Sequence, residues 1–242
     1  ASSAGTTPQA STALLLVSVT AATMTCPAGM QVGQVSQLLT APGSGINYLT
    51  FLPKNWDAEG PKLPVLLFLH GAGGVNNEDN VRGQSLTKML LTPEYATGVG
   101  HIVLIPIAPA RDWPNFFDPV LGLVDMAIAD LNGDPGRVAL AGQSMGGHGA
   151  WMLAAKQPER FCAIVPICGY IDRQDEQSAQ VASVAATLAS KAIWVFHAED
   201  DKIVSVGASD AIVGKLKEAG AAKLTYTRYA PGLAPGAPKL PG

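Results

Sequence analysis

The stretch Gly136-Arg-Val-Ala-Leu-Ala-Gly142-Gln-Ser144-Met-Gly146-Gly-His-Gly-Ala-Trp151 decides the fold of this chain. An apolar run typical of a β-strand ends in Gly-x-Ser-x-Gly, and small residues typical of a helix follow. This order predicts a nucleophile elbow, a sharp strand-to-helix turn that exposes a serine hydroxyl. Gly142 and Gly146 suit such a turn because side chains at these positions would collide with neighbouring backbone. The sequence therefore predicts that Ser144 is a catalytic nucleophile.

Composition is consistent with one globular domain. The chain has 242 residues, 48% of them hydrophobic and 14% charged, which suits a sheet covered on both faces. The net charge of −3 argues against a nucleic-acid partner. The three cysteines are too few for a disulfide framework, and we expect Cys162 and Cys168 to be small core residues. No zinc-binding motif occurs, so we expect neither a metal nor an organic cofactor.

The chain divides into a short leader, one domain and a tail. We expect residues 1–30 to be a leader or targeting remnant, 31–230 a single α/β domain, and 231–242 a Pro/Gly-rich tail. The apolar run Ala13–Ala22 is too short to span a bilayer. If it is a targeting remnant, the protein is secreted or organellar, and otherwise it is cytoplasmic. An extra strand or a disordered leader is the alternative for this run.

Strands alternate with helices along the domain, which predicts a mostly parallel sheet with right-handed crossovers. The turn-rich segment 132–136 is expected to lead into the strand before Ser144. The expected strands are 34–39, 48–52, 64–70, 102–107, 137–141, 161–168, 192–197 and 224–229. The expected helices are 119–131, 145–157, 179–190 and 206–219.

Two further strand ends carry groups that suit the chemistry of a serine nucleophile, because an open parallel sheet binds ligands at the carboxyl ends of its strands. His70-Gly-Ala-Gly-Gly74 predicts half of an oxyanion hole, in which the Ala72 N–H joins the Met145 N–H. A plain strand-to-loop turn is the alternative. A phosphate-binding loop is excluded, because neither of its glycine patterns occurs here.

Acidic residues follow the strand 192–197 in Glu199-Asp-Asp201. They come after the serine, as the order Ser…Asp…His requires, and we favour Asp201 as the acid that orients a catalytic imidazole. A solvated acidic turn that caps the next helix is the alternative. Trp113, after the strand 102–107, is expected either to line the substrate cleft or to be a packing residue.

The chain resembles the compact esterases of the α/β-hydrolase superfamily, which group with carboxylesterase/phospholipase, dienelactone-hydrolase-like and polyhydroxybutyrate-depolymerase-like enzymes. The matching stretches include Leu66-Leu-Phe-Leu-His-Gly-Ala-Gly-Gly74, Gly142-Gln-Ser-Met-Gly-Gly147 and Trp194-Val-Phe-His-Ala-Glu-Asp-Asp201, within residues 47–229. The resemblance implies an α/β-hydrolase fold. Only 57 positions separate Ser144 from Asp201, so we expect a minimal lid. Its His-Gly-x-x-Asp motif carries the acid role onto Asp201, although Ala198 replaces the usual glycine.

The general base is missing from this pattern. The family's histidine follows the last strand, whereas all four histidines here, His70, His101, His148 and His197, precede 224–229. His148 lies one helical turn after Ser144 but precedes the acid, so we do not expect it to be the base. We expect the catalytic histidine to follow Gly242 in a longer chain. A hydrolase that has lost its base is the alternative.

The sequence therefore predicts a serine hydrolase that cleaves small-molecule carboxylic esters through an acyl-enzyme on Ser144. A peptidase or thioesterase on the same scaffold is the nearest alternative, since the fold does not choose the leaving group. A catalytically inactive ligand-binding protein is the alternative from another class.

Overall fold

The computed structural model describes residues 26–173 and 175–232. Its centre is an eight-stranded sheet with the order β1-β2-β4-β3-β5-β6-β7-β8. Only β2 runs antiparallel to its neighbours among these strands. The strands are β1 (Leu39–Thr40), β2 (Asn47–Phe51), β3 (Leu63–Leu69), β4 (Ile102–Pro106), β5 (Gly133–Gln143), β6 (Ala163–Ile167), β7 (Ala192–Ala198) and β8 (Leu224–Tyr229).

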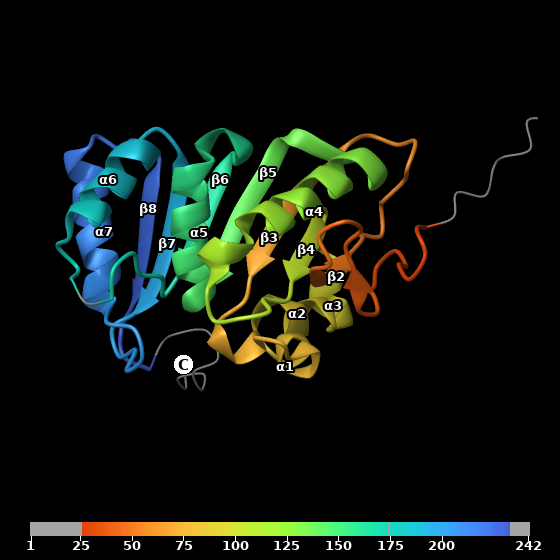
Figure 1. Ribbon diagram of the computed structural model, residues 1–242, viewed down its shortest axis with the longest axis horizontal. Helices are drawn as coiled ribbons and strands as arrows, with labels where there is room; N and C mark the ends of the chain where they lie inside the picture. Colours follow the sequence, from red (N-terminus) through yellow and green to blue (C-terminus); the bar gives the residue numbers. More distant parts are fainter. Residues whose placement is uncertain (1–25, 174, 233–242) are drawn as a thin grey trace, which may run out of the picture.

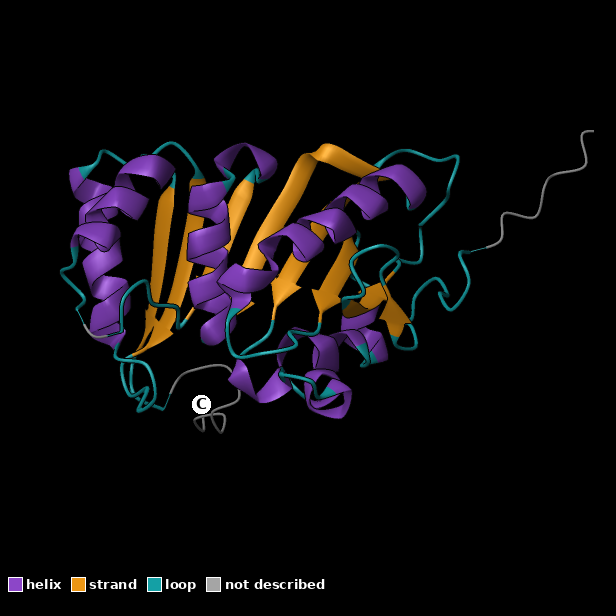
Figure 2. Cartoon of the chain, in the orientation of Figure 1, coloured by secondary structure: helices purple, strands orange, loops and turns teal. Residues whose placement is uncertain are grey.

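Helices connect the parallel strands and cover the sheet. Figure 1 shows α4, α5, α6 and α7 in front of the sheet, whereas α1 to α3 lie near the carboxyl ends of β3 and β4. Figure 2 shows the same division between strands and helices, and the mostly parallel sheet flanked by helices confirms the predicted α/β class. The α-helices are α1 (Glu78–Gly83), α2 (Ser85–Leu90), α3 (Pro93–Ala96), α4 (Phe117–Asp130), α5 (Met145–Lys156), α6 (Ala179–Leu188) and α7 (Val206–Glu218). Three 3-10 turns are η1 (Ala72–Gly74), η2 (Trp113–Phe116) and η3 (Pro158–Arg160).

The sheet separates two hydrophobic clusters because successive side chains of a strand point to opposite faces. Leu67 and Leu69 of β3 pack in the cluster beneath α4 and α5, while Phe68 packs in the cluster that α1 to α3 cover. This second cluster does not reach across the whole sheet. Over β7, Trp194 is 48% exposed and stacks on Phe196, so this part of the second face is open among the described residues.

Two expected elements differ from the structure. The predicted strand 34–39 is reduced to β1 and an isolated bridge at Val35, because the Ser36 Oγ accepts the Thr50 N–H and interrupts the ladder with β2. The predicted turn 132–136 is instead a bulged start of β5. There, Asp134 accepts the Gly136 N–H, and the register with β3 shifts between Leu63 and Val65.

The remaining domain expectations concern the ends of the chain. Met30 is buried in the main core, so the packed structure begins at least there. The expected leader before residue 26, the run Ala13–Ala22 included, and the tail after residue 232 lie outside the described residues. No helix among those residues has the length and apolar character needed to cross a bilayer.

Candidate active site

Ser144 stands at the turn between β5 and α5 in a strained conformation. Its φ of 57° and ψ of −115° place a non-glycine residue in a sparsely populated region of backbone space. The Ser144 N–H donates to the Ile167 carbonyl at 2.8 Å, which ties the turn to the end of β6. Such strain persists only where the surrounding structure over-determines it. The predicted strand–serine–helix order is present as the sequence analysis described it.

The glycines on each side of Ser144 are required by close backbone contacts. A Cβ on Gly142 would lie 2.1 Å from the Gly146 carbonyl oxygen, and one on Gly146 would lie 1.9 Å from the Leu69 carbonyl oxygen. Both separations are far below van der Waals contact. A Cβ added to Gly147 would likewise lie 2.7 Å from the Gly169 Cα. α5 can therefore begin directly against the ends of β3 and β6.

The loop after β3 lies beside the serine. β3 and β5 are paired in parallel, with Leu69 opposite Gly142, so both strands end at the same edge of the sheet. A Cβ added to Gly71 would lie 3.5 Å from the Ser144 Cβ. Ala72 is the first residue of η1 and Met145 the first of α5, and the first N–H groups of a helix have no partner within the helix. The structure thus brings both predicted oxyanion donors to the edge where Ser144 lies.

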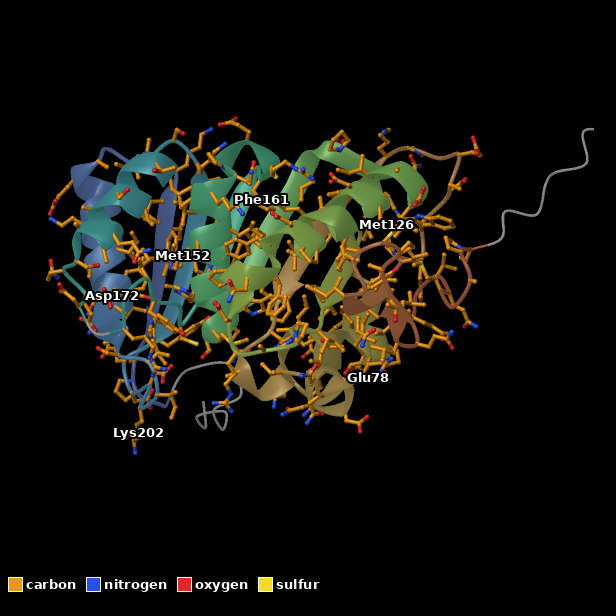
Figure 3. All side chains as sticks on the ribbon, viewed as in Figure 1. Glu78, Met126, Met152, Phe161, Asp172 and Lys202 are labelled. Atoms are coloured by element: carbon orange, nitrogen blue, oxygen red, sulfur yellow. The ribbon has the colours of Figure 1, made fainter. Side chains whose placement is uncertain are left out.

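The three acids after β7 have different partners. Glu199 pairs with Arg228 at 3.4 Å, and the Asp200 Oδ2 accepts the Gly232 N–H at 2.9 Å. The Asp201 Oδ1 accepts the Ile203 and Val204 N–H groups, at 2.8 and 3.0 Å. Asp201 also lines a cavity of about 620 Å³, together with Cys168 and with Gln143, which precedes Ser144 in the chain. The neighbouring Lys202 points away from the sheet (Figure 3).

Two of the four histidines lie near the site, and their rings interact with other groups. The His70 Nδ1 lies 2.6 Å from the Gly71 carbonyl and its Nε2 accepts the Ala108 N–H, while burial lowers the pKa of the ring. His148 stacks on Tyr170, and its Nδ1 lies 3.1 Å from the Tyr170 carbonyl. Burial also lowers the pKa of His148. In the described part of the chain, neither ring forms a hydrogen bond with the Ser144 side chain.

The other two histidines, His101 and His197, lie at the opposite edge of the sheet and in the protein interior. His101 precedes β4 and so lies at the amino edge of the sheet, opposite the edge that carries Ser144. His197 ends β7 with a fully buried ring held between Ser209 and Val204. Among the described residues, none of the four histidine rings forms a hydrogen bond with the Ser144 side chain, and a base that follows Gly242 stays a prediction.

Cys168 occupies the space between the serine and the acid. It follows β6 with a positive φ of 41°, and its N–H donates to the Phe196 carbonyl. Burial, then the charge of Asp201, raises the pKa of the thiol to about 11, although the Ser144 N–H acts in the opposite direction. The expectation of two core cysteines is wrong, because Cys162 is exposed at the loop before β6 and Cys168 is only partly buried and lines the cavity.

We expect alkylation to distinguish these two cysteines. With a pKa near 11, Cys168 carries about a hundredfold less thiolate at pH 8.5 than an ordinary thiol. Iodoacetamide should therefore modify Cys162 well before Cys168, as peptide mass spectrometry can follow. Asp201→Asn removes a negative charge beside the thiol, so it should lower the pKa of Cys168 and speed its alkylation. The rate at Cys162 is the internal control, and equal acceleration at both cysteines would contradict the assignment.

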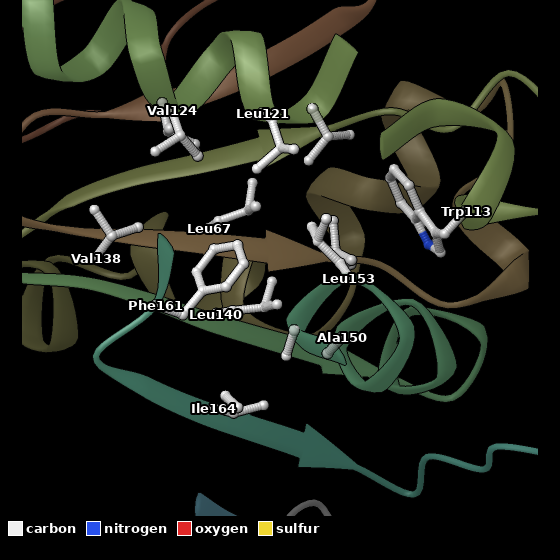
Figure 4. Close-up of a cluster of buried hydrophobic side chains, with 14 of the residues drawn as sticks. Leu67, Trp113, Leu121, Val124, Val138, Leu140, Ala150, Leu153, Phe161 and Ile164 are labelled. Atoms are coloured by element: carbon white, nitrogen blue, oxygen red, sulfur yellow. The ribbon is translucent and has the colours of Figure 1, made fainter. Parts of the chain in front are cut away.

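Trp113 is part of the core and not of the cavity wall, which corrects the cleft-lining expectation in favour of packing. Its side chain is fully buried, and its Nε1–H donates to the His70 carbonyl at 3.0 Å. A Cβ on Gly149 of α5 would lie 2.8 Å from the Trp113 Cβ. Figure 4 draws Trp113 within the buried cluster that also contains Leu121 and Leu153. Trp113 thus joins α5 to the loop that carries Ala72.

Sequence reasoning missed one residue of this site. The sequence predicts Cys168 as a core residue at the end of the strand 161–168, yet it lines the cavity and lies beside both the Ser144 backbone and Asp201. The short Cys-Gly pair after an apolar strand was the available signal, since strand ends collect functional groups in parallel sheets. Within the described residues, no three His, Cys, Asp or Glu side chains converge as metal ligands would.

Comparisons with known proteins agree with this geometry. Residues 120–214, which include Ser144 and Asp201, match the family described as "Putative esterase". No curated protein matches the chain. A solved thermostable esterase is 32% identical, with a TM-score of 0.61, and the match covers 81% of this chain and 54% of that one. This chain therefore spans about half the length of that esterase.

Two more distant structures match nearly their whole length. A ferulic acid esterase is 20% identical with a TM-score of 0.63, and the match covers 84% of this chain and 92% of that one. An S-formylglutathione hydrolase from Agrobacterium tumefaciens is 16% identical with a TM-score of 0.58, covering 82% and 91%. At these identities the likeness shows the fold alone. The finer resemblance to dienelactone hydrolases and polyhydroxybutyrate depolymerases stays a prediction. The chain has the α/β-hydrolase fold and carries, over residues 120–214, the sequence pattern of that esterase family.

Proposed function

We propose that the protein is a serine hydrolase of carboxylic esters in which Ser144 forms the acyl-enzyme. The observation that carries this proposal is the strained backbone at Ser144, held between two glycines that tolerate no Cβ. Strain of this kind gathers at functional sites because it places a side chain where relaxed backbone would not. The match to an esterase family over residues 120–214 supports the same activity.

The proposed reaction uses the groups at the carboxyl edge in sequence. The Ser144 Oγ attacks the ester carbonyl carbon while its proton passes to an imidazole, and the Ala72 and Met145 N–H groups stabilise the oxyanion. The C–O bond then breaks, and the alcohol leaves with that proton. Water attacks the acyl-enzyme through the same imidazole and releases the acid. Asp201 orients the imidazole and stabilises its charged form.

We infer that the imidazole in this scheme comes from outside the 242 residues. Hydrogen bonds engage the rings of His70, His148 and His197 with other groups, and His101 lies at the opposite edge of the sheet. The cavity beside Asp201 provides the space for it. This requirement gives a direct test. A serine without its base reacts slowly, and free imidazole that enters the cavity should restore part of its reactivity.

We expect a fluorophosphonate probe to label the 242-residue protein slowly, and faster, in a saturable manner, as imidazole is added. Ser144→Ala should abolish the label, whereas Ser183→Ala, an exposed serine of α6, should leave it unchanged. A longer form with a histidine after Gly242 should react without added imidazole. If neither the supplemented nor the longer form is labelled at Ser144, the protein is a ligand-binding protein and not a hydrolase.

The choice of leaving group requires its own measurement. Parallel assays with p-nitrophenyl acetate, an acyl thioester and an amide compare the hydrolysis rates of the three bonds. They use the form of the protein that the fluorophosphonate probe labels. We expect the ester to give the highest kcat/KM. A higher value for the thioester or the amide would replace the ester assignment while keeping Ser144 as the nucleophile.

A further inference from the structure

His197 is a fully buried histidine that the proposed reaction does not use. It ends β7, and both of its ring nitrogens have partners inside the protein. Its Nδ1 lies 2.8 Å from the Ser209 Oγ on α7, and its Nε2 lies 3.0 Å from the Val204 carbonyl oxygen. Because a carbonyl only accepts hydrogen bonds, the Nε2 carries the proton, and in the neutral ring the Ser209 hydroxyl donates to Nδ1.

The Val204 peptide connects this ring to the proposed acid. Its carbonyl accepts from His197, while its N–H donates to the Asp201 Oδ1 at 3.0 Å. The His197 Nε2 also lies 3.7 Å from the Asp201 Oδ2, on the other side of the carboxylate. One imidazole therefore fixes the peptide that holds one carboxylate oxygen and lies next to the second oxygen.

In the loop 199–205, the Val204 side chain is buried and the Asp201 carboxylate also contacts Cys168, whereas the other residues of the loop are largely exposed. Ile203 is 74% exposed, and its carbonyl accepts from the exposed side chain of Arg173. Asp200 bonds the exposed Gly232 backbone. Hydrogen bonds at exposed sites compete with water and hold a loop weakly, whereas a buried one cannot be replaced without cost. His197 is thus a fully buried hydrogen-bonding attachment of this loop, beside the buried Val204 side chain.

We propose that His197 is a positioning residue that sets the orientation of the Asp201 carboxylate through the Val204 peptide. The proposal rests on the role proposed above for Asp201 as the acid. Its geometric part can nevertheless be measured without any catalysis, so the two proposals can fail separately.

Two amide substitutions separate the nitrogens of the ring. In His197→Gln, the side-chain NH2 can reach the position of Nε2 and keep the donor to Val204. In His197→Asn, the shorter side chain reaches only the position of Nδ1, so the Val204 carbonyl loses its donor. Both variants remove the same aromatic packing, so a purely structural role predicts similar effects for the two. Ser209→Ala is a milder third variant, which leaves the ring in place but removes its hydroxyl partner.

The measurement is amide hydrogen exchange and 15N-resolved NMR of the 242-residue protein. We expect Ile203 and Val204 amide exchange in His197→Asn to be about tenfold faster than in His197→Gln, with Ser209→Ala in between. The Val195 amide in the middle of β7 is the control and should respond alike in both. Equal exchange at Ile203 and Val204 in the Gln and Asn variants overturns the proposal. If either variant fails to fold, Ser209→Ala replaces it in the comparison, and unchanged exchange at Ile203 and Val204 in Ser209→Ala then overturns the proposal.

A kinetic measurement addresses the catalytic part. In imidazole-supplemented ester hydrolysis, His197→Asn should lower kcat with KM unchanged, and His197→Gln should restore most of it. A change confined to KM would overturn the positioning role in catalysis. If Ser144 is not labelled at all while the exchange pattern is found, the esterase proposal fails and the attachment of Asp201 by His197 stands.

Discussion

Gly146→Ala should abolish stable folding of the domain. The added Cβ would lie 1.9 Å from the Leu69 carbonyl oxygen and 2.8 Å from that of His70, and both obstacles are backbone atoms of β3 and its loop. Backbone cannot rotate away as a flexible side chain can, so either α5 or β3 must shift. We expect a loss of about 4 kcal/mol or more in the free energy of unfolding, in the range of the most severe single substitutions.

Urea unfolding followed by circular dichroism measures this loss. Gly122→Ala in α4 is the matched control, because a Cβ there meets nothing within 4 Å and alanine is the better helix former. It should raise the free energy of unfolding by about 1 kcal/mol. Similar behaviour of the two variants would show that the close approach of α5 to β3 does not exist in solution.

Trp113→Ala should destabilise the protein by about 3–5 kcal/mol, as expected for deleting a fully buried tryptophan. The deletion opens a cavity beside α5 and also leaves the His70 carbonyl without its donor. An unsatisfied buried acceptor adds to the cost. Because Trp113 contacts Gly149, the loss should also loosen the start of α5 and slow the labelling of Ser144.

Trp194→Ala provides the comparison, since Trp194 is 48% exposed on β7 and its Nε1–H donates to Thr227. Its removal should cost about 1 kcal/mol or less. Trp113→Phe should fall between the two, because the ring volume is mostly kept while the bond to His70 is lost. A larger effect at Trp194 than at Trp113 would contradict the placement of Trp113 in the core.

Local sequence patterns were sufficient wherever an element is defined by its own residues. β8 begins and ends where the sequence predicts, and β3, β4, α5 and α7 differ by a residue or two. Continuous apolar runs and helical spacing report burial directly, because each reflects which faces of an element meet the core. The short helices α1 to α3 were not predicted. With four to six residues each, they are too short to show a helical period.

Long-range contacts explain the remaining differences. The predicted strand 34–39 is broken by a hydrogen bond between Ser36 and Thr50, and neither residue signals this in its own segment. Trp113 is a core residue because Gly149, far along the chain, leaves room for it. A sequence pattern contains no information about which distant residue lies across a packed interface.

The sequence by itself determined the elbow, because Gly142, Ser144 and Gly146 form a local pattern between an apolar strand and a helix. The contact that requires Gly146 comes from Leu69, far along the chain. The sequence also determined the strand ends at which Ala72 and Asp201 stand. Only the tertiary structure decided which groups meet at these ends. Cys168 packs between Ser144 and Asp201, His197 bonds Ser209 of α7 as well as Val204, and His148 stacks on Tyr170. The physical reason is that these relations depend on parallel pairing of β5, β6 and β7, which brings side chains together across three strands.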